Sequence, residues 1–112
     1  MKAPKFAYTR VLDVGEAIAA LAAGAAKAMS GSQSLGPMLN LRLARPAQVV
    51  DVAQIPSLRT VSRKADWIEI GPADTHAEIE DGTHPPLAAH PMRQVARGIA
   101  YRAIRTRGTI GG

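Results

Sequence analysis

A loop of small residues between two apolar segments is the stretch of this sequence best suited to chemistry. Residues 30–34 read Ser-Gly-Ser-Gln-Ser, after the apolar pair at 28–29 and before a segment with helical apolar spacing. A strand, a small-residue loop and a helix in this order point main-chain N–H groups at an anion, and a phosphate can approach backbone that lacks bulky side chains. The partial positive charge of the helix start favours the same ligand. The loop therefore indicates a phosphate site; an ordinary connection that binds nothing is the alternative.

Other reactive residue types form no comparable pattern. The histidines are His76, His84 and His90. They lack the HxxxH spacing that places two ligands on one helix face, so we expect surface or capping residues rather than metal ligands. The acidic residues are Glu78, Glu80 and Asp81, which we interpret as the solvated side of a short helix. Cysteine is absent, which excludes disulfides and thiolate chemistry within the chain. The sequence thus offers no acid, base, nucleophile or metal site.

The first half of the chain has the order of elements needed to position the loop. Residues 6–8 can form a short edge strand, and residues 49–52 a buried one. Asp13, with Glu16 three residues later, predicts the start of a helix that runs through 17–23 and ends at Gly24. The helix after the loop has an apolar face made of Leu35, Met38, Leu39 and Leu43. The order strand, helix, strand, helix, strand predicts a small, mainly parallel sheet with helices on its faces.

The character of the sequence changes near residue 58. Alternating residues at 59–63 and 67–71, joined by a turn at 64–66, predict a hairpin. A short helix over 75–80 follows, capped by Thr75 or Asp74, and a long helix over 87–101 is interrupted by Pro91 and weakened by Gly98. We therefore predict two lobes, at residues 1–57 and 58–112.

Composition sets broader limits. With 112 residues the chain is one domain at most, or a piece of a larger one. Alanine makes up much of its hydrophobic content and aromatic residues are few, so the expected core is thin. The net charge of +5 suits nucleic acid, acidic lipid or a phosphate-bearing cofactor. Neither a signal peptide nor a membrane span is visible, and we expect a cytoplasmic location.

Three stretches, at residues 30–44, 70–80 and 102–112, resemble the FAD-binding subunit of the molybdenum hydroxylases. That family includes the middle subunit of carbon monoxide dehydrogenase and the flavin domain of xanthine dehydrogenase and aldehyde oxidase. The resemblance covers nearly the whole chain, with the motifs in the family's order and spacing. It implies an α+β, two-lobed flavin-binding fold of the molybdopterin dehydrogenase type, with a small α/β lobe and the beginning of an antiparallel-sheet lobe.

The resemblance implies FAD as the cofactor. In the family, the loop matching residues 30–35 wraps the FAD diphosphate through backbone N–H groups, and the stretches matching 71–74 and 109–112 add contacts from the second lobe. Carried onto this sequence, the implied cofactor-binding residues are Met29, Ser30, Gly31, Ser32, Gln33, Ser34, Leu35, Gly71, Asp74, Thr109, Gly111 and Gly112. Two glycine-bearing loops on separate lobes would hold a diphosphate that one loop holds only weakly.

Three features depart from the family's pattern. Ser32 follows Gly31 where the family usually has two glycines, and serine fits unless the position needs a positive φ. Asp74 stands where threonine is common; a carboxylate facing the diphosphate would cost about 1 kcal/mol or more. The sequence ends at Gly112, inside the third motif, whereas family members continue. We therefore expect the front part of a flavoprotein.

The resemblance implies a subunit that passes electrons from iron–sulfur clusters through FAD to an external acceptor. The implied partners are a large molybdopterin subunit and a small 2Fe-2S subunit. One alternative is a non-enzymatic fragment that binds no flavin alone. A less favoured one is a small nucleic-acid-binding module using Arg102, Arg105 and Arg107. Arg42 and Arg45 fit either a phosphate contact or a cap on helix carbonyls.

Overall fold

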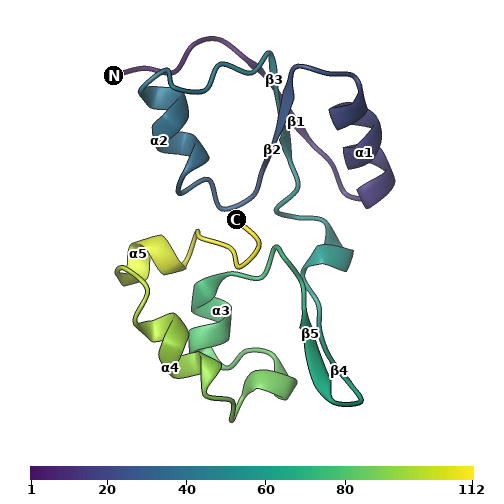
Figure 1. The fold of residues 1–112 in the computed structure, drawn as a ribbon, viewed down its shortest axis with the longest axis vertical. Helices are drawn as coiled ribbons and strands as arrows, with labels where there is room; N and C mark the ends of the chain where they lie inside the picture. Colours follow the sequence, from purple (N-terminus) through teal and green to yellow (C-terminus); the bar gives the residue numbers. More distant parts are fainter.

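A three-stranded parallel sheet organises the first half of the chain in the computed structural model, which describes residues 1–112. The strand order is β1 (Ala7–Arg10), β3 (Gln48–Asp51), β2 (Ala26–Met29), so β3 lies in the centre. The two valines of β3, Val49 and Val50, are fully buried, as expected for a strand covered on both faces. The predicted parallel sheet is confirmed (Figure 1).

Helix α1 (Val14–Ala22) lies beside this sheet and starts at the predicted cap. The Asp13 carboxylate accepts the N–H of Glu16 at 2.7 Å, which satisfies one of the free donors of the first turn. The chain leaves the helix through Gly24, whose φ of 86° is in the left-handed region. Ala17 packs with Val50 into the core of this half.

Helix α2 (Leu35–Asn40) is shorter than its apolar pattern predicts. The chain turns at Arg42, with a φ of 60°, and the N–H of Leu43 donates to Met38 O at 2.8 Å. Leu43 is consequently 72% exposed, so its predicted place on the apolar face of the helix is wrong. Helix α2 ends because backbone hydrogen bonds close a turn at its C-terminus, before the apolar pattern of the sequence ends.

The second half pairs an antiparallel hairpin with three short helices. The hairpin consists of β4 (Val61–Lys64) and β5 (Trp67–Ile70), as predicted. The helices are α3 (His76–Asp81), α4 (Met92–Arg97) and α5 (Arg102–Arg105), with 3₁₀ turns η1 (Pro56–Leu58) and η2 (Pro85–Leu87). Its core is made of Ile79, Leu87 and Ala96. The predicted boundary between residues 57 and 58 falls within η1.

The single helix predicted over residues 87–101 is wrong. Pro91 stands at the N-cap of α4, because proline lacks the N–H that a helix interior needs. Gly98 caps the other end, and Ala100, with a φ of 46°, turns the chain before α5. Residues 87–101 and the segment after them therefore form separate short helices instead of one long helix.

The C-terminal segment returns to the middle of the molecule, between the two halves and beside the β2–α2 loop (Figure 1). Thr109 forms an antiparallel bridge with Thr75, and the N–H of Ile110 donates to Asp74 O at 3.0 Å. None of the helices has the length and apolar character needed to cross a membrane.

Candidate functional site: a cleft between two loops

The β2–α2 loop and the C-terminal segment touch at Gly31. The N–H of Gly31 donates to Thr109 Oγ1 at 3.3 Å. A Cβ added at Gly31 would lie 2.4 Å from Arg107 O and 2.8 Å from the Cα of Gly108. Only glycine permits this approach, because an ordinary Cβ contact begins near 3.4 Å. The β2–α2 loop and the C-terminal segment, which this contact joins across 78 positions of the sequence, thus lie against each other.

The hydroxyl of Thr109 joins the loops through three contacts. Besides Gly31 N, it lies 2.9 Å from Ser30 Oγ and 2.7 Å from Gly112 O. A hydroxyl has one hydrogen and two lone pairs, so it can donate to the carbonyl and accept from the other two. Thr109 is buried, which keeps these bonds from competing with water. It therefore positions the loop.

The β2–α2 loop carries free main-chain donors. The N–H groups of residues 32–35 donate no hydrogen bond within the chain. Ser32 has a φ of 60°, so this position needs the left-handed conformation, in which serine is strained by about 1–2 kcal/mol. Helix α2 has only 6 residues, so the loop's own N–H groups matter more than its dipole. These four donors are suited to an anionic ligand.

The C-terminal segment has no such free donors at its tip. The N–H groups of Gly111 and Gly112 donate to Pro72 O at 2.9 Å and Thr109 O at 3.1 Å. A Cβ at Gly111 would lie 2.5 Å from Pro72 Cβ, so this glycine permits close packing. The amides of Gly111 and Gly112 are therefore not free to donate to a diphosphate. The β2–α2 loop has the free N–H donors, whereas the C-terminal segment contributes only part of the wall of the cleft described next.

A cleft of about 440 Å³ opens between these segments, and half of the residues that line it are apolar. Of the residues implied by the resemblance, it collects Met29, Ser30, Ser32, Gln33, Ser34, Leu35, Gly111 and Gly112. The sequence analysis missed other parts of its wall, which are Lys27, Ala28, Met38, Ala44, Val52, Leu58, Pro72 and Ala73. They are mostly ordinary apolar residues from separate elements, so no local pattern marks them.

Four implied residues lie outside this lining, although three of them shape it. Gly31 and Thr109 hold the loops together. Gly71 packs so closely that an added Cβ would lie 2.3 Å from Leu58 O. The fourth residue, Asp74, differs: its side chain is fully buried and does not line the cleft. No repulsion between this carboxylate and a ligand in the cleft is expected, because the carboxylate is turned elsewhere.

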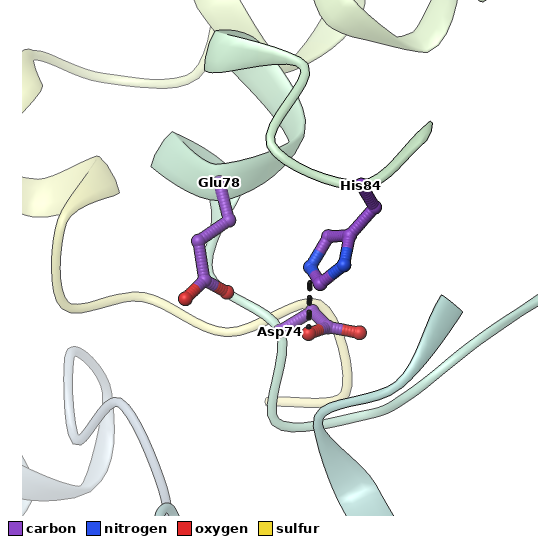
Figure 2. Close-up of side chains that lie close together, drawn as sticks. All are labelled: Asp74, Glu78 and His84. Carbon is purple, nitrogen blue, oxygen red and sulfur yellow. Dashed lines mark ion pairs between the residues drawn. The ribbon is translucent and has the colours of Figure 1, made fainter. Parts of the chain in front are cut away.

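The Asp74 carboxylate faces His84, with Oδ1 3.1 Å from Nε2 (Figure 2). Burial raises the pKa of Asp74 above its usual range, while His84 lowers it in part. His84 is thus no isolated surface residue, which corrects the expectation from its irregular spacing. The pair joins two segments ten residues apart, which the sequence analysis did not connect.

A larger, polar cleft of about 680 Å³ shares Met29, Ser30 and Ser32 with the first and is also lined by Gly31. Arg10, Arg59 and Arg107 are among the residues that line it. These arginines come from β1, from the segment after η1 and from the C-terminal segment, so only the tertiary fold brings them together. Asp51, Glu78 and Asp81 line the same cleft, and Arg59 pairs with Glu78, so the β2–α2 loop has side chains of both charges beside it.

The acidic residues of α3 are paired rather than merely solvated, which corrects that prediction. Glu80 accepts from Arg105 Nε at 2.6 Å, and Asp81 accepts from Arg102 at 2.7 Å. These hydrogen bonds hold the pKa values of Glu80 and Asp81 below their usual range. Arg102 and Arg105 are consequently occupied by carboxylates.

The two arginines after α2 contact main-chain carbonyls. Arg42 donates from Nε to Lys2 O at 3.2 Å, and Arg45 donates to Arg42 O at 3.1 Å. Neither carbonyl belongs to a helix, so these contacts support neither of the two roles left open by the sequence.

Comparison with known proteins identifies relatives along the full chain. The family described as the FAD binding domain in molybdopterin dehydrogenase matches residues 4–112. The nicotine 6-hydroxylase medium subunit of Paenarthrobacter nicotinovorans is 37% identical over 115 residues, covering 100% of this chain and 40% of the relative. The carbon monoxide dehydrogenase medium chain of Hydrogenophaga pseudoflava is 33% identical over 111 residues, covering 97% and 39%.

Solved structures give the same result for the fold. Quinoline 2-oxidoreductase from Pseudomonas putida 86 superposes with a TM-score of 0.92 at 34% identity, over 100% of this chain and 40% of that one. Carbon monoxide dehydrogenase from Hydrogenophaga pseudoflava gives a TM-score of 0.90 at 34% identity, with the same coverage. The predicted fold class is confirmed. The chain spans about two fifths of the length of these relatives.

Proposed function

The chain belongs to the family of FAD binding domains in molybdopterin dehydrogenases, and we propose that its cleft holds the diphosphate of FAD. FAD is the cofactor of this family. The observation that carries the proposal is the set of unpaired N–H groups at residues 32–35, which face no partner within the chain. A diphosphate is a strong acceptor of charge-assisted hydrogen bonds from such groups.

Each segment around the cleft has a separate task in this proposal. The first loop donates hydrogen bonds to the diphosphate oxygens. Gly111 and Pro72 form a close-packed wall that limits the access of water, while Thr109 fixes the loop from behind. The apolar side chains of Leu35 and Met38 offer contact area for the parts of the ligand next to the phosphates.

Bound FAD supplies the electron-transfer chemistry, and the chain binds and orients it. We propose that the protein acts as the medium subunit of a molybdenum-containing hydroxylase and that electrons reach its FAD from iron–sulfur clusters. A large molybdopterin subunit and a small 2Fe-2S subunit are the proposed partners. The relatives that support this assembly are a medium subunit and a medium chain by name. Residues 1–57 and 58–112 are the proposed lobes on either side of the cleft.

A charge placed at Ser34 tests the site. Ser34 lines the cleft and stands at the N-cap of α2, a position that accepts aspartate and asparagine equally well. Ser34→Asp adds a negative charge beside the diphosphate, and Ser34→Asn is its neutral match. Two like charges about 5 Å apart repel by about 1–3 kcal/mol at a protein surface, so we expect Ser34→Asp to weaken FAD binding by roughly tenfold to a hundredfold.

Flavin fluorescence and calorimetry measure this binding, with ADP and FMN as partial ligands. ADP retains the diphosphate and should compete with FAD, whereas FMN lacks the diphosphate and should not. Urea unfolding of both variants shows whether their folds are equally stable. Equal FAD affinity in Ser34→Asp and Ser34→Asn, or competition by FMN but not ADP, would refute the placement of the diphosphate at this loop.

A further inference from the structure

Three side chains of ligand type converge beside the second loop, away from the lining of the cleft (Figure 2). Asp74 precedes α3, Glu78 is the third residue of α3, and His84 stands at the N-cap of η2. One ligand atom from each lies within 4.8 Å of the others. Asp74 directly precedes the capping box at the start of α3, Glu78 is part of that box, and His84 reaches them from the turn after the helix.

The centre of this cluster lacks hydrogen-bond partners. Asp74 is 0% exposed, and neither of its carboxylate oxygens has a well-aligned hydrogen bond. The Gly71 N–H lies near enough to lower the pKa of Asp74, but it donates to Thr60 O at 2.7 Å. His84 Nε2 is also buried without a hydrogen bond, because its 3.1 Å approach to Asp74 Oδ1 is not aligned for one. A buried carboxylate without a donor is costly, and native proteins rarely retain one. The geometry therefore leaves a place for a positively charged occupant.

We propose that Asp74, Glu78 and His84 bind a divalent transition-metal ion, with zinc as the best match. Two ligands of tetrahedral zinc lie roughly 3.4 Å apart when both bonds are near 2.1 Å, close to the observed separation of Asp74 and His84. An imidazole combined with carboxylates favours zinc over magnesium and calcium, which prefer oxygen ligands throughout.

Glu78 completes the protein ligands and is itself held in place. Its Oε2 accepts the Thr75 N–H at 2.9 Å, and its Oε1 pairs with Arg59. Each carboxylate oxygen has a second lone pair, so these contacts orient the ligand without excluding a metal bond. The composition of the cluster also agrees: it holds two carboxylates, those of Asp74 and Glu78, and only one guanidinium, that of Arg59, pairs with it. A dication compensates the remaining negative charge.

A metal at this site would hold the start of α3, and through it the C-terminal segment, in place. A metal bound there links the N-terminus of η2 to the start of α3. It also fixes Asp74, whose carbonyl accepts the Ile110 N–H of the C-terminal segment at 3.0 Å. The binding of the ion does not depend on the proposed FAD site, because none of its three ligands lines that cleft.

Zinc titration of the 112-residue chain tests the proposal, with magnesium as the comparison ion. Proton NMR resolves the ring signals of its three histidines, His76, His84 and His90. We expect one zinc ion to bind per chain, the His84 signals to shift or exchange, and magnesium to have no effect. Cobalt(II) should give visible absorption bands that zinc abolishes.

Matched variants locate the ligands. Asp74→Asn and His84→Gln should weaken zinc binding roughly tenfold or more, whereas Asp66→Asn and His90→Gln, at exposed positions, should not. Circular dichroism checks the fold of each variant. A flat titration, or affinity unchanged in both ligand variants, would overturn the site. If a ligand variant fails to fold, the histidine signals of the wild-type chain decide the question. The proposed site would be overturned if zinc shifted the ring signals of His76 or His90 and left those of His84 unchanged.

Discussion

Gly31→Ala is the change that most directly tests the contact between the two loops. The added Cβ would lie 2.4 Å from Arg107 O and 2.9 Å from Thr109 N, both of which are backbone atoms. Backbone cannot swing aside like the end of a side chain, so the loops must separate by about 1 Å to restore an ordinary contact near 3.4 Å.

Two losses set the magnitude. Overpacking of this kind costs about 1–3 kcal/mol. The hydrogen bond from Gly31 N to Thr109 Oγ1, already 3.3 Å long, breaks on separation and adds about 1 kcal/mol. The expected loss of unfolding free energy is therefore about 2–4 kcal/mol, a large part of the roughly 5–15 kcal/mol of a typical domain.

Urea unfolding followed by circular dichroism measures the change. With a slope of about 2 kcal/mol per molar, the midpoint should fall by roughly 1–2 M. Gly98→Ala is the matched control, since the same methyl group there meets only Val95 O at an ordinary 3.5 Å, and φ is −79°. Equal midpoints for Gly31→Ala and the wild type would refute the close approach of the loops.

Three further predictions concern stability. Thr109→Val keeps the shape but removes the hydroxyl that serves both loops, so we expect a loss of about 1–3 kcal/mol in urea unfolding, with Thr106→Val, at an exposed position, nearly neutral. Because the folded pKa values of Glu80 and Asp81 are lowered from 4.5 and 3.8, their stabilisation is present above those values and is lost as pH falls through the folded ones. In the metal-free protein Asp74 acts oppositely, because its raised pKa gives stability at low pH that is lost as pH rises. Asp74→Asn should therefore lose stability more steeply than the wild type on acidification, and a parallel pH profile would contradict this.

The elements that the sequence predicted well depend on short-range signals. Asp13 caps α1 through a residue three positions away, and Thr75 forms a capping box with Glu78 over the same distance. The alternation of the hairpin strands is equally local. The errors arise where tertiary contacts and backbone turns decide, as at Leu43, where a hydrogen-bonded turn ends α2 before its apolar pattern ends.

The candidate site shows the same division between local and distant information. The composition of residues 30–34 marks the loop in the sequence, but the contact between Gly31 and Thr109 joins residues 78 positions apart. The pairing of Asp74 with His84 depends on how the chain turns after α3. A comparison of positions with the family predicts which residues stand in a motif. It does not predict that the Asp74 side chain is buried away from the cleft.

The free N–H groups of the first loop explain why a second loop is needed at all. Unpaired donors and a strained Ser32, with a φ of 60°, both raise the free energy of the ligand-free loop. A loop held only by its neighbours would relax by folding those donors onto nearby carbonyls. The Thr109 hydroxyl and the close approach at Gly31 prevent this by fixing one end of the loop, while α2 fixes the other. In the proposed site, the C-terminal segment would therefore contribute to anion binding without offering amides of its own, because it would keep those of residues 32–35 available.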